Sequence, residues 1–597
     1  MNRFTVRILL LLGLLAAAPL AWGQGAPPEK ADAPGLRFNG LGRAYIQQTD
    51  LGGPIADGDT SFAERLADGE FLLDLAINAQ PNASTEVQGI LRLRNEFGGF
   101  FGSGVSIEVR ELWARGIIAN ALEYRVGDMN VAMTPYTLFL PDEDGRVNTP
   151  ELFEPQKDVI YYEEFYTGLN ERRLQGARLD FGLEFDRWVD AVDVRAFLAR
   201  LRPTNFTDTP TRLIGGGRLG GSVNALGLRF TPGFNYVSVW DDLESGNANT
   251  GIRNHVGSFD GALSLLEREA LSLQLVGEGG WSVAKQADET PVDPIATPDP
   301  SAEPLVLETD TFFEIGLAAG FPRVDVDVSA HFVNVGPDFF SAAAQSKRVD
   351  YTRSQRQFSR IGASRDRRGI GLFDLTRDPA IYTFRIADGL MNYDPRYNNA
   401  QPYGAATANR RGLRLGAEYE PSGGAQAELM VALLREIRGQ GTDELKGFAL
   451  IRGAVDVPVG PLIGYARTLA FSLGGQYEQT TRGGEAIEEV DLTSVLLEAG
   501  ITAEIYDRLD VLIGVTTRTS SGRDYVPQIR DFNDVRDFPA AFVTDDSEQL
   551  YGAGLRYRFG SGSYLTVQLQ KYSYGDDATP DDDYTFNQVF ALYTLPF

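Results

Sequence analysis

Apolar residues occupy every second position in short segments along most of the chain. The stretch "SYLTVQLQKY" places Leu565, Val567 and Leu569 on one side of an extended segment and polar residues on the other. The stretch "RVDVDVSAHF" alternates valines with Asp325 and Asp327 in the same way. Because side chains of a strand point alternately to its two faces, this period predicts strands with one apolar and one polar face.

The pattern predicts an all-β protein of about twenty-two strands, with a range of eighteen to twenty-four, and the connections between strands are alternately short and long. The predicted strands are 36–48, 70–80, 85–96, 105–118, 122–132, 173–185, 190–202, 216–230, 234–241, 254–266, 270–283, 310–320, 323–335, 410–420, 425–437, 446–458, 467–479, 490–505, 509–519, 549–560, 563–574 and 585–597. The long loops are predicted at 133–172, 284–309, 336–409 and 520–548. A single antiparallel up-and-down barrel in a bacterial outer membrane has this asymmetry, with short periplasmic turns and long extracellular loops.

The absence of long apolar runs supports a barrel over a helical membrane protein. After residue 23, no run of about eighteen apolar residues is found, so spanning helices are excluded. A chain in hydrocarbon must pair every backbone N–H and C=O internally, which leaves helices or closed barrels. A soluble β-sandwich also has alternating strands, but sandwich domains rarely extend one uninterrupted series of strands over so long a chain.

The first 23 residues have the features of an export signal. Arg3 and Arg7 form a basic segment, an apolar stretch follows, and "AWG" at 21–23 places small residues where a signal peptidase reads them. We therefore expect cleavage before Gln24. Residues 24–35 would then form a short periplasmic segment, and 36–597 the transmembrane barrel.

The chain ends with a strand pattern that continues to its last residue. In "VFALYTLPF", Tyr593, Leu595 and Phe597 alternate with other residues up to the terminus. Pro596 cannot donate to a ladder, so we expect it just outside the last paired position. With the export signal and the hairpin rhythm over 36–597, this ending resembles bacterial outer-membrane β-barrel proteins of the porin-like kind.

The resemblance implies a fold, a location and partners. Outer-membrane lipid and lipopolysaccharide would surround the barrel, and the barrel assembly machinery would recognise Tyr593, Leu595 and Phe597. Small hydrophilic solutes would pass through a lumen too wide for wall side chains to fill. Facing this lumen, we expect Arg92, Arg94, Arg556 and Arg558, which lie on the polar faces of their strands.

The longest connection, 336–409, contains the best candidate for a pore constriction. Its segment 347–368 has eight Lys or Arg residues against two Asp residues, within a chain of net charge −27. Such a segment could fold into the lumen against acidic wall residues or lie outside against anionic lipopolysaccharide. The candidate constriction residues are Arg353, Arg356, Arg360, Arg365, Arg367 and Arg368 on the loop, with Asp325 and Asp327 on the wall. Opposite charges across a narrow aqueous pore select solutes by charge.

Other chemistry has little support in the sequence. The chain contains no cysteine, only two histidines, and no spacing typical of a metal or nucleotide site, so we expect no cofactor and no metal. Ser329 and His331 share a strand face, but neither a third orienting group nor an oxyanion hole is recognisable, so we assign no catalytic residue. The net negative charge argues against nucleic acid as a partner.

Three functions remain open from the sequence. The first is a porin-like channel for passive or semi-selective passage of small hydrophilic solutes, which could include anionic ones. A barrel for export or import of a polymer, distantly similar to the charged-lumen alginate-export barrels, is the second. A surface adhesin or structural barrel is the third. A TonB-dependent transporter fits poorly, because its plug domain would precede the first strand, and strand-like sequence here begins near Leu36.

Overall fold

A computed structural model of the chain describes most of the region after residue 34. The described residues are 35–54, 56, 65–97, 105–138, 150–155, 174–185, 188–202, 204, 210–225, 227–242, 252–286, 305–344, 395–396, 399–526, 539–560 and 562–597. The expected signal peptide, the segment 24–34 and the basic segment 347–368 lie outside them.

The described residues form twenty-two strands, as predicted, with two very short helices. The elements are β1 (Gly35–Gly52), β2 (Arg65–Asn82), β3 (Thr85–Glu96), β4 (Val105–Ile118), β5 (Leu122–Met129), β6 (Leu174–Glu184), β7 (Val189–Arg202), β8 (Thr211–Ala225), β9 (Leu228–Asp242), β10 (Ile252–Arg268), β11 (Leu271–Gln286), β12 (Leu305–Phe321), β13 (Val326–Val335), β14 (Arg410–Tyr419), β15 (Gln426–Arg435), β16 (Gly447–Pro458), α5 (Val459–Leu462), β17 (Leu469–Arg482), β18 (Val490–Tyr506), β19 (Leu509–Val526), β20 (Ala540–Gly560), β21 (Ser563–Asp576), η4 (Pro580–Asp582) and β22 (Tyr584–Pro596). Over the part of the chain that is described, no helix has the length and apolar character needed to cross a membrane.

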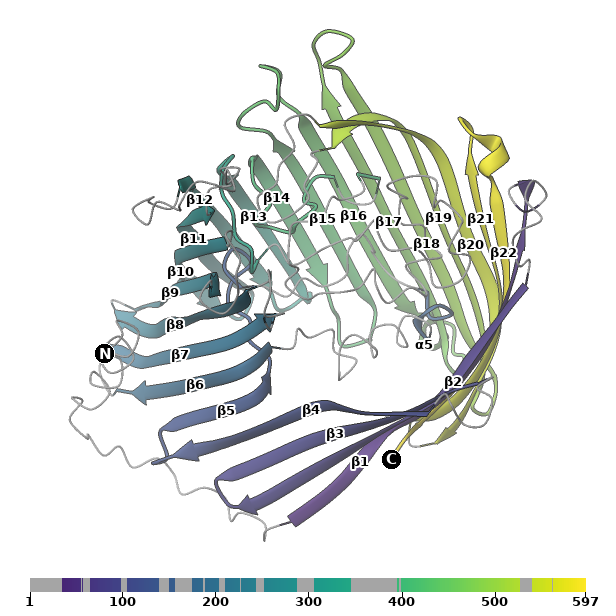
Figure 1. The fold of residues 1–597 in the computed structure, drawn as a ribbon, viewed down its shortest axis with the longest axis horizontal. Coiled ribbons are helices and arrows are strands. Elements are labelled where there is room, and N and C mark those ends of the chain that lie inside the picture. The colour runs from purple at the N-terminus through teal and green to yellow at the C-terminus, as the bar shows by residue number, and fades with distance from the viewer. Residues whose placement is uncertain are drawn as a thin grey trace, which may run out of the picture.

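The strands form one closed antiparallel barrel. Each strand pairs with the next along the chain, and β22 pairs with β1 from Leu41 opposite Pro596 to Gly52 opposite Thr585. Figure 1 shows the resulting wall, with the C-terminus beside β1. Closure leaves no strand edge with unpaired backbone groups, which is the condition for a sheet to cross hydrocarbon.

The two faces of the wall differ as the alternating pattern predicts. Large apolar side chains on one face are exposed, among them Ile107 at 65%, Phe259 at 62% and Leu569 at 63%. The other face carries buried polar and charged groups, such as Arg92 at 1% and Gln568 at 0%. An apolar face turned outwards and a polar face turned inwards is the arrangement of a transmembrane barrel.

Two predicted loops are shorter than expected, because their flanking strands extend further. The loop expected at 520–548 is reduced to 527–539, since β19 continues to Val526 and β20 starts at Ala540. The loop expected at 284–309 is reduced to 287–304 in the same way. The added parts of β19 and β20 lack the apolar alternation, because a hairpin that extends beyond the apolar band needs backbone pairing but no apolar face.

Two single-residue expectations were wrong. Asp325 is not on a wall strand: it lies in the turn 322–325 with a φ of 52°, and β13 begins at Val326. A short left-handed turn needs a residue that tolerates positive φ, and Asp does so better than the neighbouring valines. Pro596 is not outside the ladder, since it lies opposite Leu41. The pairing of β21 with β22 ends at Thr594, so the missing N–H of Pro596 faces past the end of that ladder.

The last strand faces as the sequence predicts. Val589, Leu595 and Phe597 are 45%, 39% and 52% exposed on the outer face, whereas Phe590 and Leu592 on the alternate positions are buried. The recognition of this strand by the assembly machinery stays a prediction.

Candidate functional site

Two long connections enter the barrel and contact its inner wall. Insert one joins β5 to β6 and is described at 130–138 and 150–155. Insert two joins β13 to β14 and is described at 336–344, 395–396 and 399–409. The described parts of both inserts pack on the face that carries the buried polar groups. They therefore occupy the lumen.

The first part of insert one is anchored by an apolar cluster. Val131 and Leu138 of the insert pack with Phe197 of β7, Ile214 of β8 and Val237 of β9. Ala342 and Ala343 of insert two belong to the same cluster, which joins the two inserts to each other as well as to the wall. Full burial of such side chains contributes roughly 1.5–3 kcal/mol each, so the cluster holds both inserts against this part of the wall.

A polar network anchors the same segment to three further strands. The hydroxyl of Tyr136 donates to Glu314 of β12, and Arg414 of β14 pairs with the same carboxylate. Nδ1 of His331 on β13 lies 2.7 Å from the other oxygen of Glu314. The ring of Tyr136 stacks on Phe312, with centroids 4.1 Å apart. Burial raises the pKa of Tyr136 well above its usual value, so its hydroxyl remains a donor.

The second part of insert one reaches the opposite wall. Glu151 accepts a hydrogen bond from Thr502 of β18, and its Oε1 lies 2.5 Å from a guanidinium nitrogen of Arg556 on β20. Leu152 rests on glycines of the wall: a Cβ at Gly514 would lie 3.1 Å from its Cβ, and a Cβ at Gly554 would lie 3.0 Å from one of its methyl carbons. Because β8 and β19 are half the ring apart, the two described parts of insert one contact opposite sides of the lumen.

Insert two is also fixed at both ends. Asn254 of β10 donates through its side chain to the carbonyl of Phe340 at 2.9 Å, near the start of the insert. Near its end, the side chain of Asn399 donates to Thr480 of β17 and to Asp524 of β19, each at 2.7 Å. The described ends of the connection 336–409 therefore lie in the lumen. The basic segment 347–368 lies outside the described residues, so its position stays a prediction, as does the constriction role assigned to Arg353, Arg356, Arg360, Arg365, Arg367 and Arg368.

The four predicted wall arginines lie on the inner face, and each is matched by a carboxylate. Arg92 pairs with Asp74 at 2.6 Å and Arg94 with Glu70 at 3.3 Å. Arg556 and Arg558 both contact Asp510, each at 2.9 Å. Sequence reasoning found the arginines but missed these partners, although Asp74, Glu70 and Asp510 occupy the polar positions of their own strands.

Further ion pairs continue along β6 to β10. Asp180 lies 2.5 Å from Arg178 and 2.8 Å from Arg195, so one carboxylate bridges two guanidinium groups. Arg218 lies 2.6 Å from Asp260. The inner wall therefore offers a solute an alternating series of positive and negative groups.

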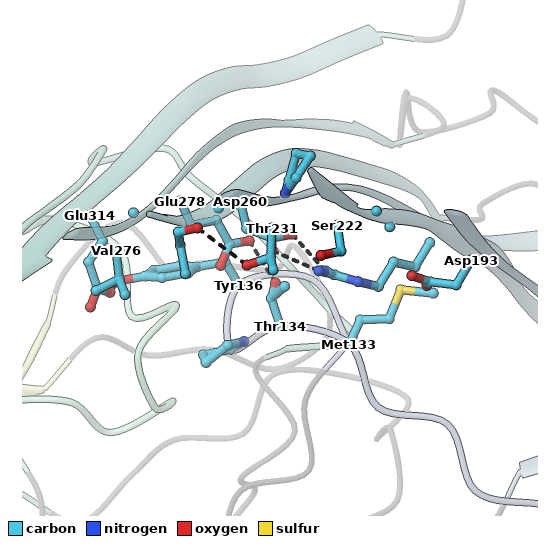
Figure 2. A pocket seen from close by; sticks show the side chains of 18 of the residues that line it. Met133, Thr134, Tyr136, Asp193, Ser222, Thr231, Asp260, Val276, Glu278 and Glu314 are labelled. Carbon is cyan, nitrogen blue, oxygen red and sulfur yellow. Dashed lines mark hydrogen bonds and ion pairs between the residues drawn. The ribbon is translucent and has the colours of Figure 1, made fainter. Parts of the chain in front are cut away.

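A cavity of about 660 Å³ lies between insert one and this part of the wall. Figure 2 shows Thr134 and Tyr136 of the insert beside Asp260, Glu278 and Glu314 of the wall. Thr134 donates to Glu278 at 2.7 Å, which ties the insert to β11 at the edge of the cavity. The polar residues that line the cavity include Thr134, Tyr136, Asp193, Arg218, Asp260 and Glu278.

The remaining sequence candidates are placed as follows. Asp327 is exposed on the inner face near the short turn that precedes β13. His331 contacts Glu314 and forms no described hydrogen bond with Ser329, so the described contacts do not assemble the Ser/His pair. Sequence reasoning missed Tyr136, Glu151 and Leu152, because a contact between an insert and a distant strand leaves no periodic signal.

Comparisons with known proteins give structural similarities only. No family model and no curated protein match the chain. The outer membrane protein OpdK of Pseudomonas aeruginosa is 10% identical, with a TM-score of 0.31, and the match covers 94% of this chain and 99% of that one. OccAB1 of Acinetobacter baumannii is 10% identical with a TM-score of 0.31, covering 95% and 99%. A BenF-like porin of Pseudomonas fluorescens is 8% identical with a TM-score of 0.29, covering 94% and 98%.

Proposed function

We propose that the chain is an outer-membrane channel for small hydrophilic solutes, with a lumen narrowed by inserts one and two. The observation that carries this proposal is the polar inner wall of a closed barrel, against which both inserts are held at opposite sides. A twenty-two-strand ring is too wide for wall side chains to fill, so the inserts set the width of the passage.

The paired charges of the inner wall support selection of polar solutes. Each arginine of the series Arg178, Arg195 and Arg218 lies within 2.8 Å of an aspartate. A solute that carries charge or many hydroxyl groups can exchange its water for these fixed donors and acceptors as it passes. Such a solute would bind transiently in the cavity beside Glu278. We assign no catalytic activity to the protein.

The contacts of insert one favour small solutes over a polymer. Leu138 and Leu152 are fully buried against walls half the ring apart, so the insert reaches both sides of the path that an extended polymer would need. We also propose that the protein is exported by a signal peptide cleaved before Gln24. N-terminal sequencing of the membrane-inserted protein tests this, and any other mature first residue contradicts it.

Planar-bilayer recording of the purified, heat-modifiable barrel tests the channel proposal. We expect stepwise conductance. We also expect a cation-to-anion permeability ratio that differs from the ratio of the mobilities of the same ions in free solution. Folded protein that inserts into the bilayer without conductance steps would contradict the proposal and leave a structural or adhesive barrel as the explanation.

A further inference from the structure

A polar row crosses the outer face of the barrel where β13, β14 and β15 meet their long connections. In the strand register, Asn334 lies opposite Arg411, and Arg411 lies opposite Arg435. Both arginines are exposed. Their side chains lie on the same face of the sheet as the exposed Leu413 and Leu433, which are two residues further into the two strands. The row therefore points away from the lumen.

The two guanidinium groups of this row have donors to spare. Arg411 makes one hydrogen bond with the described residues, in which its Nε donates to the side-chain oxygen of Asn334 at 2.6 Å. Arg435 has no hydrogen bond or ion pair with any residue that the structure describes. Like charges directly opposite each other on paired strands are destabilising unless an anion lies between them. Elsewhere on this barrel, arginines such as Arg92 and Arg212 lie within 2.8 Å of carboxylates.

The row lies at the edge of the apolar band. Strands β13, β14 and β15 have 10 residues each, about the length that spans the hydrocarbon core. Arg435 is the last residue of β15, and Arg411 is the second residue of β14. Immediately below them are Leu413 and Leu433, which are 48% and 53% exposed. The guanidinium groups are thus at headgroup depth on the side of the long connections.

The wall leaves space beside Arg435. The next residue in the row is Gly447 of β16, and beyond it is Thr481 of β17. A Cβ placed on Gly447 would have the hydroxyl of Thr481 as its nearest neighbour, at 3.7 Å. An anion can therefore approach Arg435 over the glycine and accept a further hydrogen bond from the exposed Thr481.

We propose that Arg411 and Arg435 bind a phosphate group of a lipid in the outer leaflet, with Asn334 positioning Arg411 and Thr481 adding a hydroxyl donor. The planar guanidinium matches the oxygens of a phosphate and pairs with them in a bidentate manner. The apolar side chains directly below the row contact the acyl chains of the same molecule. This combination selects a phosphorylated lipid over free inorganic phosphate.

Native mass spectrometry of the detergent-solubilised full chain tests this site, with bis-phosphorylated lipid A as the probe. We expect the double variant Arg411→Gln/Arg435→Gln to bind lipid A about tenfold more weakly, since two solvent-exposed charge contacts are lost. Wild-type protein should bind chemically dephosphorylated lipid A as weakly as the double variant binds the intact lipid. Millimolar inorganic phosphate should not displace the intact lipid.

The matched control is Arg268→Gln/Arg323→Gln, which removes the same charge at the short-turn edge, where both residues lie. This control should bind lipid A as the wild type does. Equal binding by the Arg411/Arg435 double variant, or equal weakening by the control, would overturn the proposed site. Displacement by inorganic phosphate would overturn the assignment to a lipid. Heat-modifiability of every variant shows that the barrels compared are folded.

Discussion

Phe597 and Gly40 exchange both of their backbone hydrogen bonds: the N–H of Phe597 donates to Gly40 at 3.1 Å, and the N–H of Gly40 donates to Phe597 at 2.9 Å. The final residue of the chain is therefore paired at the seam of the barrel. A Cβ on Gly40 would clash with the carbonyl oxygen of Asp74 and would lie 2.7 Å from the Phe597 ring, so glycine is needed at this position.

Removing the terminal phenylalanine should impair assembly. Deletion of Phe597, or Phe597→Asp, removes an exposed apolar side chain from the lipid face of the seam, and deletion also removes the pair of hydrogen bonds to Gly40. We expect less heat-modifiable barrel in the membrane fraction, measured by semi-native electrophoresis. Phe597→Tyr, which keeps the ring, serves as the control. Wild-type amounts of the deletion variant would count against an assembly signal in β22.

Charged substitutions should separate the two faces of the wall. Leu429 is 48% exposed on the outer face of β15, and the adjacent Glu428 is exposed on the inner face. Leu429→Arg should destabilise the barrel by up to roughly 2–4 kcal/mol, depending on depth, whereas Glu428→Arg should cost far less. Urea unfolding in lipid vesicles measures both. Similar losses for the two variants would contradict the facing of the strand.

Not every inward position should tolerate such a change. Gln568 is fully buried and donates to Thr566 at 3.3 Å, so an arginine there has no room, although its strand neighbour Val567 faces outwards. Alternation of apolar and polar residues predicts facing, but burial on the inner side depends on what else occupies the lumen.

Loss of the Tyr136 hydroxyl should loosen insert one. Tyr136→Phe keeps the stacking on Phe312 but removes the hydrogen bond to Glu314, a bond to a charged group worth roughly 1.5–3 kcal/mol. We expect more frequent transitions between conductance levels in single-channel records. Tyr551→Phe, on the exposed outer face, is the matched control and should record as the wild type. If the Tyr136→Phe channel changes between conductance levels no more often than the wild type, this hydrogen bond does not hold the insert.

Removing one carboxylate beside the cavity should change ion selectivity. Asp260 pairs with Arg218, so Asp260→Asn removes a negative charge beside this guanidinium and makes this part of the inner wall more positive. The permeability ratio, measured from reversal potentials in a salt gradient, should shift towards anions. Asp577→Asn, outside the strands and with the same change in charge, should leave the ratio unchanged. An unaltered ratio in Asp260→Asn would place the path of ions away from this cavity.

The basic segment 347–368 should bias the channel towards anions. Replacing Arg353, Arg356, Arg360, Arg365, Arg367 and Arg368 with Gln removes positive charge from a connection whose described ends lie in the lumen. We expect permeability to shift towards cations, and deletion of the segment to increase conductance. If both variants have the conductance and the ion selectivity of the wild type, the segment lies outside the passage.

The sequence predicts the wall of this protein much better than its interior. Period-two alternation reports on neighbours within one strand, so strand number and the facing of Val589, Leu595 and Phe597 follow from it. The contact between Tyr136 and Glu314 joins residues 178 positions apart, and no local pattern encodes it. The same holds for Glu151 and Arg556, which are 405 positions apart.

A wide barrel whose strands are joined only to their neighbours has a cross-section that deforms easily under pressure from two sides. The described segment 130–138 of insert one packs on β7, β8 and β9 around Leu138, and its Tyr136 is hydrogen-bonded to Glu314 of β12 and Arg414 of β14, so it ties separated parts of the ring together. The cross-sectional shape of the barrel and the width of the passage are then mechanically coupled. Lateral pressure from the surrounding membrane would be transmitted through segment 130–138 to the part of the lumen where solutes pass.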